Sequence, residues 1–225
     1  YTFPVNPNLI KKFRAPETPG SFFLSFEGIE GSGKTTQIQE LETHLKNKSK
    51  RVLILREPGG TVFGEKLREA ILGSTSPLHP LAECHLFLAS RAQLLKEKIL
   101  PFLLEENSVV ILDRYMDSTI AYQGFARGLG LETVLTLHQH DPLSLLPHRT
   151  YFLDIDVKTS HERQKTRGQA KDYFESEKEE FYQKLVDGYR EVAGLFPDRV
   201  LKIDASVDPA SVKAQIMKDL AKFVP

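Results

Sequence analysis

Short apolar runs alternate along the chain with longer stretches in which apolar residues return every three to four positions. Short runs rich in β-branched and aromatic residues are typical of strands that are buried on both faces of a parallel sheet. The runs cover residues 21–27, 51–55, 108–112, 150–154 and 200–203. Because helical stretches separate them, the pattern predicts β–α–β units with right-handed crossovers.

The longer stretches have the spacing of amphipathic helices. Ile38, Leu41 and Leu45 fall on one face of the first such stretch, as the core-facing residues of a helix do. Pro101 lies inside a longer stretch and is expected to kink or divide that helix. We predict helices over residues 34–48, 63–72, 80–105, 130–139, 158–167, 175–195 and 208–222. This order of elements predicts an α/β fold, in which a five-stranded parallel sheet is flanked by helices.

The first part of the 225-residue chain differs from the rest, because it contains four prolines before the first predicted strand. Irregular segments of this kind run over protein surfaces. We therefore expect an N-terminal extension over residues 1–20 and a single domain over residues 21–225, which is an ordinary size for one domain.

The composition argues against several classes of protein. Lys plus Arg and Asp plus Glu both number 30, so we expect no general affinity for nucleic acid, which needs a basic surface. No apolar run could span a bilayer and the N-terminus lacks the plan of a signal peptide, so no membrane association is expected. The seven histidines form no cluster with cysteine or carboxylate support, so we predict no structural zinc and expect His138 and His140 to lie on a helix surface. The single Cys84 is typical of a protein in the reducing cytoplasm.

Residues 28–35 match the phosphate-binding pattern GxxxxGK[ST], and they lie between a predicted strand and a predicted helix. The glycines let backbone N–H groups converge on phosphate oxygens, and the helix N-terminus adds the positive end of its dipole. Lys34 can reach the β- and γ-phosphates, while the hydroxyl of Thr35 can ligate Mg²⁺. The candidate residues for a nucleoside triphosphate are Gly28, Ile29, Glu30, Gly31, Ser32, Gly33, Lys34, Thr35 and Thr36.

Two arginines follow predicted strands. Asp113 ends the third strand. Folds with a phosphate-binding loop place a second Mg²⁺-directing group at this position. The next residue is Arg114, whereas many nucleotide-hydrolysing motors carry a glutamate there to activate water. Arg56 ends the second strand. Because the carboxyl ends of parallel strands line one crevice, both arginines are expected to face the phosphate loop. This arrangement suggests a donor triphosphate and an acceptor monophosphate, although Arg114 alone could be a surface ion pair.

Phe87 and Arg91 are four residues apart on the third predicted helix and so share a face. An aromatic ring beside a guanidinium can stack on a base and hydrogen-bond a carbonyl at its edge. The alternative, which helical spacing alone favours, places Phe87 in the core and Arg91 at the surface.

These blocks together resemble the bacterial thymidylate kinases (dTMP kinases), a family of P-loop nucleoside monophosphate kinases. The resemblance covers roughly residues 21–222, and two blocks, Arg56–Thr61 and Asp113–Gly124, make it specific. The matching blocks are residues 26–36, 56–61, 86–93 and 113–124, with weaker support from 153–156 and 163–168.

The resemblance implies a three-layer P-loop nucleoside monophosphate kinase fold with a small mobile lid at approximately residues 163–178. It also implies a cytoplasmic homodimer that phosphorylates dTMP to dTDP with ATP and Mg²⁺ by direct in-line transfer, and so supplies the dTTP pathway for DNA synthesis. The residues that it assigns to dTMP are Glu30, Arg56, Phe87, Arg91, Arg114, Ser118, Tyr122 and Gln123.

Individual roles also follow from the resemblance. Arg56 and Arg114 bind the dTMP phosphate, while Phe87 stacks on thymine and Arg91 bonds a thymine carbonyl. The other assigned residues line the nucleoside pocket, with Tyr122 near the sugar 2′ position and Glu30 near the 3′-hydroxyl. Asp113, with Thr35, helps to place Mg²⁺. The acceptor oxygen is already ionised, so catalysis consists of positioning and charge neutralisation.

The lid departs from the family pattern. Some relatives carry a catalytic arginine at the position of Gly31, whereas the bacterial type has it in the lid, where this chain has Tyr173. The candidates for the lid cation are therefore Arg163, Arg167 and Lys171. Arg163 or Lys171 is predicted to supply it, because the resemblance implies that Arg167 stacks on adenine instead. The predicted catalytic residues are Lys34, Asp113, Arg114, Arg163 and Lys171.

Three alternatives remain at this stage. The chain could be a kinase of another pyrimidine nucleoside monophosphate, a nucleotide-hydrolysing switch without an acceptor, or an inactive scaffold with the same fold. Arg114 and the absence of an Asn-Lys-x-Asp motif argue against the switch, and intact Lys34 and Thr35 argue against the scaffold.

Overall fold

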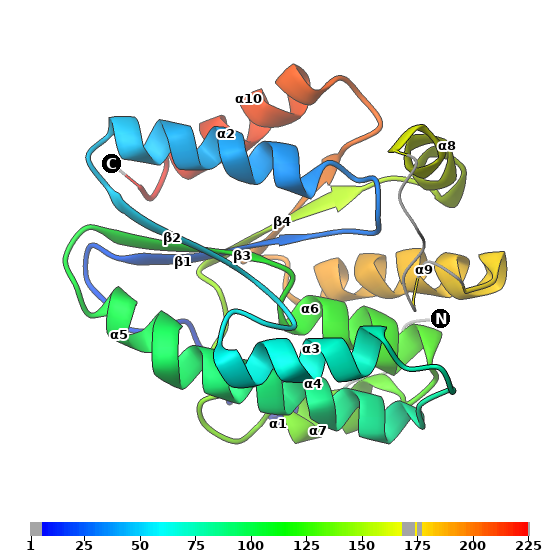
Figure 1. Ribbon diagram of the computed structural model, residues 1–225. Coiled ribbons are helices and arrows are strands. Elements are labelled where there is room, and N and C mark those ends of the chain that lie inside the picture. Colours follow the sequence, from blue (N-terminus) through cyan, green and yellow to red (C-terminus); the bar gives the residue numbers. More distant parts are fainter. Residues whose placement is uncertain (1–5, 168–173, 175–176, 225) are drawn as a thin grey trace.

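The computed structural model of the chain describes residues 6–167, 174 and 177–224 (Figure 1). Five parallel strands form one sheet in the order β2-β3-β1-β4-β5. The strands are β1 (Phe22–Glu27), β2 (Arg51–Arg56), β3 (Ser108–Asp113), β4 (Arg149–Asp154) and β5 (Val200–Asp204). Each coincides with a predicted run to within one residue at either end, so the predicted α/β fold and parallel sheet are confirmed.

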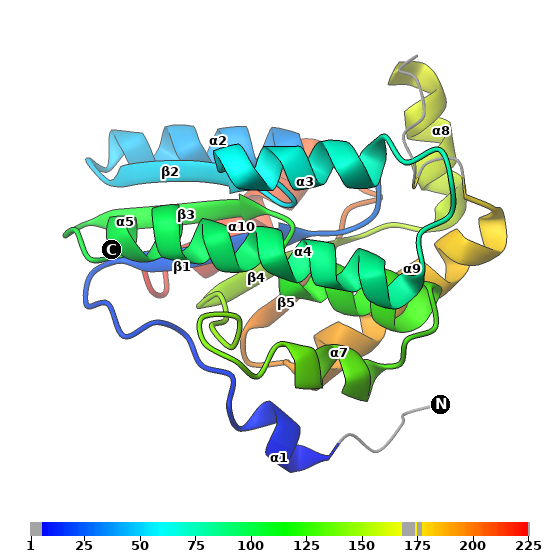
Figure 2. The same cartoon turned by 60° about the horizontal axis from the view of Figure 1, so that its bottom comes forward.

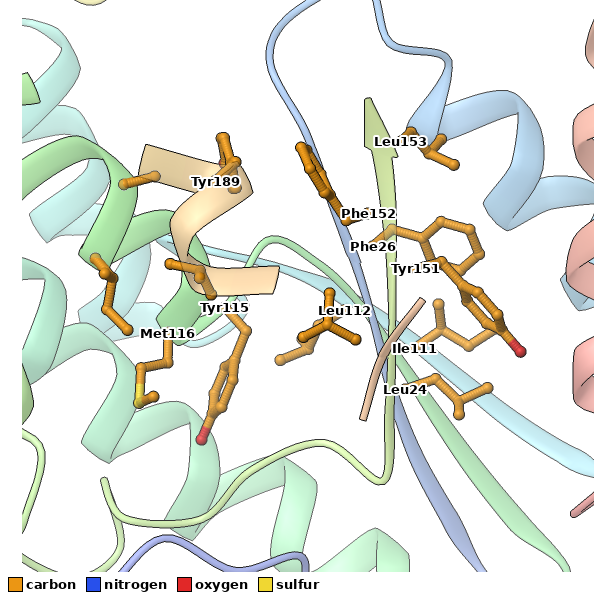
Figure 3. Packing of buried hydrophobic residues seen from close by; sticks show 14 of the residues in the cluster. Leu24, Phe26, Ile111, Leu112, Tyr115, Met116, Tyr151, Phe152, Leu153 and Tyr189 are labelled. Carbon is orange, nitrogen blue, oxygen red and sulfur yellow. The ribbon is translucent and has the colours of Figure 1, made fainter. Parts of the chain in front are cut away.

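The middle of the sheet is fully buried. Phe23 of β1 pairs with Val110 of β3, which in turn pairs with Leu53 of β2. Successive side chains of a strand point to opposite faces, so Ile111 and Leu112 lie on opposite sides of the strands in Figure 3. Apolar residues on both faces explain why β1 and β3 appear in the sequence as continuous apolar runs.

Helices cover both faces of the sheet. In Figure 1, α2 and α10 lie on one face, while α4, α5, α6 and α9 lie on the other, and Figure 2 shows the second face from below. The helices are α1 (Pro7–Ile10), α2 (Lys34–Asn47), α3 (Val62–Leu72), α4 (Pro80–Leu94), α5 (Leu100–Leu103), α6 (Met116–Thr119), α7 (Leu131–Leu137), α8 (Val157–Arg167), α9 (Glu179–Leu195) and α10 (Pro209–Leu220), with π-helical turns η1 (Leu95–Ile99) and η2 (Ile120–Ala126). Within the described residues no helix is long and apolar enough to cross a membrane.

The predicted helix over residues 80–105 is divided, as expected from Pro101. α4 passes into the π-helical turn η1, and α5 then begins one residue before the proline. Proline cannot donate a backbone hydrogen bond, and its ring crowds the carbonyl of the preceding turn. A wider π-helical turn at this point relieves that crowding.

A helical segment over residues 116–126 was not predicted from the sequence. It forms α6 and η2, and residues 116–124 of it are all buried. A helix that is buried all round has no polar face, so its residues show no amphipathic period. The segment follows Asp113 and Arg114 directly and carries several of the predicted site residues.

The described part of the N-terminal extension packs on the rest of the protein. Arg14 forms a parallel bridge with Leu145, just before β4. The ring of Phe13 lies edge-on to Phe196, with 6.5 Å between the ring centroids. Phe13 and Arg14 therefore lie near the start of β4 and the end of α9, whereas α1 contacts α7.

Candidate active site

The turn over residues 28–35 connects β1 to α2 at the carboxyl edge of the sheet. Gly28, Gly31 and Gly33 have φ angles of 137°, 78° and 94°, which residues with a Cβ rarely adopt. A Cβ on Gly28 would lie 2.6 Å from the carbonyl oxygen of Leu153. The turn therefore packs too closely on β4 for a larger residue, and the N–H groups of the first turn of α2 are left for an anion.

The side chain of Lys34 extends back to the start of this turn. Its Nζ donates to the carbonyl oxygen of Gly28 at 2.9 Å, and the side chain is buried. Burial and the charge of Arg114 lower the pKa of Lys34, while Asp113 acts in the opposite direction. The Oδ1 atom of Asp113 is buried and has no hydrogen-bond partner among the described residues. The end of β3 thus offers one carboxylate oxygen beside the phosphate-binding turn.

Arg114 follows β3 and reaches the same turn. Its Nη1 donates to the carbonyl oxygen of Gly28 at 3.0 Å and to the hydroxyl of Tyr189 at 2.8 Å. Its Nη2 forms an ion pair with Glu30, and the guanidinium lies over the ring of Tyr122, 5.3 Å from the centroid. The alternative of a surface ion pair is therefore wrong, because Arg114 lies in the cleft.

Glu30 extends from the phosphate-binding turn into the same space. The hydroxyl of Tyr122 lies 3.0 Å from Oε1 and 3.2 Å from Oε2 of Glu30. Burial alone would raise the pKa of Glu30, but the charges of Arg114 and Lys34 lower it below its ordinary value. Glu30 is thus a carboxylate that belongs to the phosphate-binding turn and faces Arg114 and Tyr122.

Glu27 and Tyr189, which hydrogen-bond Ser118 and Arg114 from behind the pocket, were not among the predicted site residues. Glu27 accepts hydrogen bonds from the backbone N–H of Tyr115 at 2.7 Å and from Ser118 Oγ at 2.6 Å. Ser118 Oγ also lies 2.7 Å from the hydroxyl of Tyr189. Burial and the neighbouring Asp117 raise the pKa of Glu27 to about 8. Glu27 ends β1, and a buried charged residue at the end of a mainly apolar strand was the only signal in the sequence.

Arg91 lies inside the protein and is only 1% exposed. Its Nε and Nη2 donate to Oε2 of Glu57 at 2.8 and 2.5 Å. Nη2 also donates to the hydroxyl of Thr119 at 2.9 Å, and Nη1 lies 2.6 Å from Nε2 of His138. The helical-spacing alternative, with Arg91 at the surface, is therefore wrong. Of the five guanidinium hydrogens, one on Nη1 is not used by these contacts.

The prediction that His138 lies on a helix surface is wrong, because its side chain is fully buried. Its Nδ1 lies 2.7 Å from the carbonyl oxygen of Val134, and its Nε2 faces Arg91. Burial and the charge of Arg91 lower the pKa of His138 to about 3. The ring is therefore neutral, with Nδ1–H donating to Val134 and Nε2 accepting from the guanidinium.

A pocket opens between these groups, at the carboxyl edge of the sheet. It contains most of the residues predicted for the acceptor, brought together from the phosphate-binding turn, α4 and the 116–126 segment. The residues that line it are Glu30, Glu57, Pro58, Arg68, Leu72, Phe87, Arg91, Arg114, Tyr115, Ser118, Thr119, Tyr122, Gln123 and Phe174. The ring of Phe174 lies 6.2 Å from that of Phe87 and 5.2 Å from that of Tyr122. A pocket with both aromatic and arginine side chains in its wall suits a ligand in which a flat ring is joined to an anionic group.

Arg56 is placed at the same edge of the sheet but does not line this pocket. Its backbone pairs with Asp113, and its Nη2 donates to Oε2 of Glu65 at 2.9 Å. Both side chains are exposed by more than a third, so this ion pair contributes little energy. A ligand anion at the pocket mouth could replace Glu65 as the partner of Arg56.

A third arginine, Arg68 of α3, lines the pocket and was missed. Its Nη1 donates to the carbonyl oxygen of Pro58 at 3.2 Å. Arg68 and Leu72 are four residues apart and share the face of α3 that meets the pocket. That spacing was visible in the sequence, but an arginine and a leucine at helical spacing are common on ordinary helices.

With this geometry in view, the comparison with known proteins is decisive. The family model described as "Thymidylate kinase" matches residues 26–216. The chain belongs to the thymidylate kinase family. It is 42% identical to the thymidylate kinase of Caldanaerobacter subterraneus subsp. tengcongensis over 90% of this chain and 96% of the relative. It is 39% identical to that of Kosmotoga olearia, over 88% of this chain and 94% of the relative.

A solved structure agrees with this assignment. The crystal structure of thymidylate kinase from Ehrlichia chaffeensis matches with a TM-score of 0.71 and 32% identity, over 90% of this chain and 99% of that chain. The resemblance seen in the sequence is therefore confirmed, and so is the nucleoside monophosphate kinase fold.

A second cavity lies on the other side of the phosphate-binding turn of this thymidylate kinase family member. It has a volume of about 390 Å³ and is lined by residues of the turn, of α2 and of the segment after β5, among them Ser32, Thr36 and Val207. Ile29, by contrast, is buried in the core. The cavity is thus next to the phosphate-binding turn and is separate from the pocket that Arg91 and Tyr122 line.

The residues that were predicted to form a lid are only partly described. Arg163 donates from Nη1 to the carbonyl oxygen of Gly31 at 3.1 Å and from Nη2 to that of Ala205 at 2.9 Å. Lys171, Tyr173 and the side chain of Arg167 lie outside the described residues. Their predicted roles in the lid remain predictions.

Gly31 itself is explained by packing. A Cβ at this position would lie 3.1 Å from the carbonyl oxygen of Ser160 and 3.3 Å from Cβ of Arg163. The phosphate-binding turn is therefore pressed against α8, and a larger side chain at this position would have to push α8 away. In this chain the position favours glycine.

Proposed function

We propose that the protein transfers the γ-phosphoryl group of ATP to the phosphate of dTMP, giving dTDP and ADP. The observation that carries this proposal is the contact of Arg114 with both halves of the cleft. The arginine bonds the phosphate-binding turn through Gly28 and lies over Tyr122 in the adjoining pocket. An arginine so placed can bind an acceptor phosphate beside the donor phosphates.

The donor side is the turn over residues 28–35 together with the second cavity. The N–H groups of the turn and the N-terminus of α2 bind phosphate oxygens, and Lys34 adds a positive charge. Lys34 Nζ and Arg114 Nη1 both donate to the carbonyl oxygen of Gly28. When phosphate oxygens replace this carbonyl oxygen as the acceptor, Lys34 and Arg114 both donate hydrogen bonds to the transferred phosphoryl group.

The acceptor side is the pocket. Phe87 and Tyr122 give thymine and deoxyribose apolar walls, Arg91 directs its remaining N–H to a base carbonyl, and Glu30 and Tyr122 face the sugar. Arg114 binds the phosphate of dTMP, with Arg56 and Arg68 as further cations near the pocket mouth. Because Tyr122 is held against Glu30, a 2′-hydroxyl would meet a fixed ring, which favours deoxyribonucleotides.

The residues fit a magnesium ion. Asp113 contributes a buried oxygen to which no described residue hydrogen-bonds, and Thr35 is exposed in the first turn of α2. Such oxygen ligands are what Mg²⁺ prefers, together with phosphate oxygens. When bound, the ion supplies neutralisation of the charge on the phosphates.

The mechanism needs no strong general base. The attacking oxygen of dTMP is already ionised, so the residues need only align it with the γ-phosphorus and neutralise charge. Lys34 and Arg114 do this from the cleft. Either Arg163 or Lys171 supplies a further cation from the lid at approximately residues 163–178, and Arg167 stacks on adenine.

We also propose that two copies of the chain associate as a homodimer. Val62 and Phe63 support this, because they begin α3 with 79% and 48% of their surfaces exposed, and adjacent exposed apolar residues favour burial against a partner. The proposed substrates are intracellular nucleotides, which places the reaction in the cytoplasm.

A substrate panel tests the choice of acceptor. The purified protein is given ATP and Mg²⁺ with dTMP, dUMP, dCMP, dGMP or UMP, and ADP formation is followed by a coupled assay. The highest kcat/KM is expected with dTMP. A clear preference for another monophosphate would instead support the runner-up, a different pyrimidine nucleoside monophosphate kinase.

A further inference from the structure

Glu83 lies buried behind the pocket and contacts one of its lining residues. It belongs to α4 and is fully buried, while Gln123 of η2 lines the pocket and is 1% exposed. Nε2 of Gln123 donates to Oε1 of Glu83 at 2.7 Å. Nε of Arg127 lies 3.3 Å from the same oxygen, so the carboxylate has both an ionic and a neutral partner.

This contact fixes which end of the Gln123 amide faces the ligand. An amide has a donor end and an acceptor end, whereas a carboxylate can only accept. The NH₂ group must therefore point to Glu83, which leaves Oε1 of Gln123 on the pocket side. Oε1 receives no hydrogen bond from any residue in the described part of the chain, and it is not sealed from the pocket.

Arg91 presents the opposite polarity to the same pocket. Glu57, Thr119 and His138 occupy its other hydrogens, and one Nη1 hydrogen remains. The pocket therefore offers one acceptor and one donor to the edge of a base. Thymine and uracil complement this pair, because their N3–H donates and their O4 accepts. Cytosine does not when Arg91 faces position 4 of the base and Gln123 faces N3, as in the proposed function, because the N3 of cytosine accepts and its N4 amino group donates.

We infer that Glu83 is a positioning residue that sets base specificity, because it holds the Gln123 amide with its carbonyl toward the ligand. The inference rests on the proposed function, in which the pocket receives the base of dTMP. A site whose buried polar groups are fixed in one polarity rejects a base of the opposite polarity, since the groups would be left unpaired.

The experiment compares E83Q with E97Q. In E83Q the carboxamide can donate as well as accept, so the Gln123 amide is free to reverse. The ratio of kcat/KM for dTMP to that for dCMP should fall about tenfold or more, while the ratio for dTMP to dUMP should stay within about twofold, because uracil has the same edge. E97Q is the matched control: Glu97 also accepts from a glutamine, Gln93, at 3.0 Å, but on an exposed surface. Neither ratio should change in E97Q.

The same substitution in a Q123L background shows whether Glu83 acts by positioning Gln123 or has a general structural role. In a Q123L background, E83Q should cause no further change in the dTMP/dCMP ratio, because the residue acts through Gln123. Glu83→Met removes the carboxylate and occupies similar space, and it should give the same fall if E83Q folds poorly. An unchanged ratio in both Glu83 variants, or an equal fall in the Q123L background, would overturn the inference.

The two proposals fail in different ways. If the parent protein shows no preference for dTMP over dCMP, the proposed substrate is wrong. If the parent prefers dTMP and the Glu83 variants keep that preference, only the role of Glu83 is wrong.

Discussion

Lys34 and Arg114 share one acceptor, the carbonyl oxygen of Gly28, at 2.9 and 3.0 Å. Two cations so close together repel each other, and the charge of Arg114 contributes to the lowered pKa of Lys34. Glu30 offsets part of this repulsion through its ion pair with Arg114. A polyphosphate at the turn would offset it more fully, so the residues are arranged for a ligand with high negative charge.

Replacing Lys34 tests this at residue scale. Lys34→Met keeps most of the side-chain length and removes the charge, so kcat should fall by ~10²–10³ or more, as for other preorganised cations. Lys46→Met is the control, because Lys46 lies on the same helix with 59% of its side chain exposed. Steady-state kinetics at saturating ATP and dTMP give both values. A Lys34 variant within a few-fold of the parent would contradict the role.

The buried His138 should make the free energy of unfolding depend on pH. The folded protein holds the ring neutral, with its pKa lowered to about 3, whereas the unfolded chain binds a proton near the ordinary value. As pH falls below about 6.5, the unfolded state gains a proton that the folded state does not, and the parent loses about 1.4 kcal/mol of stability per pH unit from this residue.

His138→Asn lacks this term and keeps an acceptor for Arg91. It should be less stable than the parent at pH 7.5, and the difference should shrink toward pH 5.5 in denaturant unfolding. His85→Asn, at an exposed position of α4, is the control. A difference that does not change with pH would show that His138 is not held neutral.

At the scale of elements, the phosphate-binding turn is shaped by what it packs against. β4 presses on Gly28 and α8 on Gly31, so the turn cannot relax to a looser form while both neighbours stay in place. Arg163 adds hydrogen bonds from α8 to the turn and to the segment after β5. The phosphate-binding turn and α8 are thus linked by both packing and hydrogen bonds.

Two glycine substitutions test this packing. Gly28→Ala should destabilise the protein by about 2 kcal/mol or more, since its φ is 137° and its Cβ would meet a backbone oxygen. Gly194→Ala, in α9 with open space around it, should stabilise by about 0.5–1 kcal/mol. Thermal unfolding measures both. Similar shifts for the two would refute the close-packing explanation.

The lid prediction also belongs to this scale. Arg163→Ala, Arg167→Ala and Lys171→Ala are each made singly, and one of the variants at 163 or 171 should lower kcat by about 10²-fold or more, as loss of a transition-state cation does. Arg167→Ala should chiefly raise KM for ATP. If all three kept kcat within a few-fold of the parent, the chain would have no lid cation among these residues.

At the scale of the whole molecule, the elements that could be predicted are those whose apolar residues recur with a regular period or whose motif is continuous in sequence. The five strands and the phosphate-binding turn are continuous in sequence and were predicted closely. Residues 116–126 were not predicted as a helix, because burial on every side removes the period. The partners of Arg91 were equally hidden: Glu57 and His138 lie 34 and 47 residues away, and only the fold brings them together.

The central claim is that the cleft holds a donor and an acceptor phosphate at once. The most direct measurement is the rate of ADP formation from ATP and Mg²⁺ with and without dTMP, with dTDP measured in parallel. We predict that ADP forms rapidly only when dTMP is present, with one dTDP for each ADP. ADP formation that is indifferent to dTMP would contradict the account and support a nucleotide-hydrolysing switch.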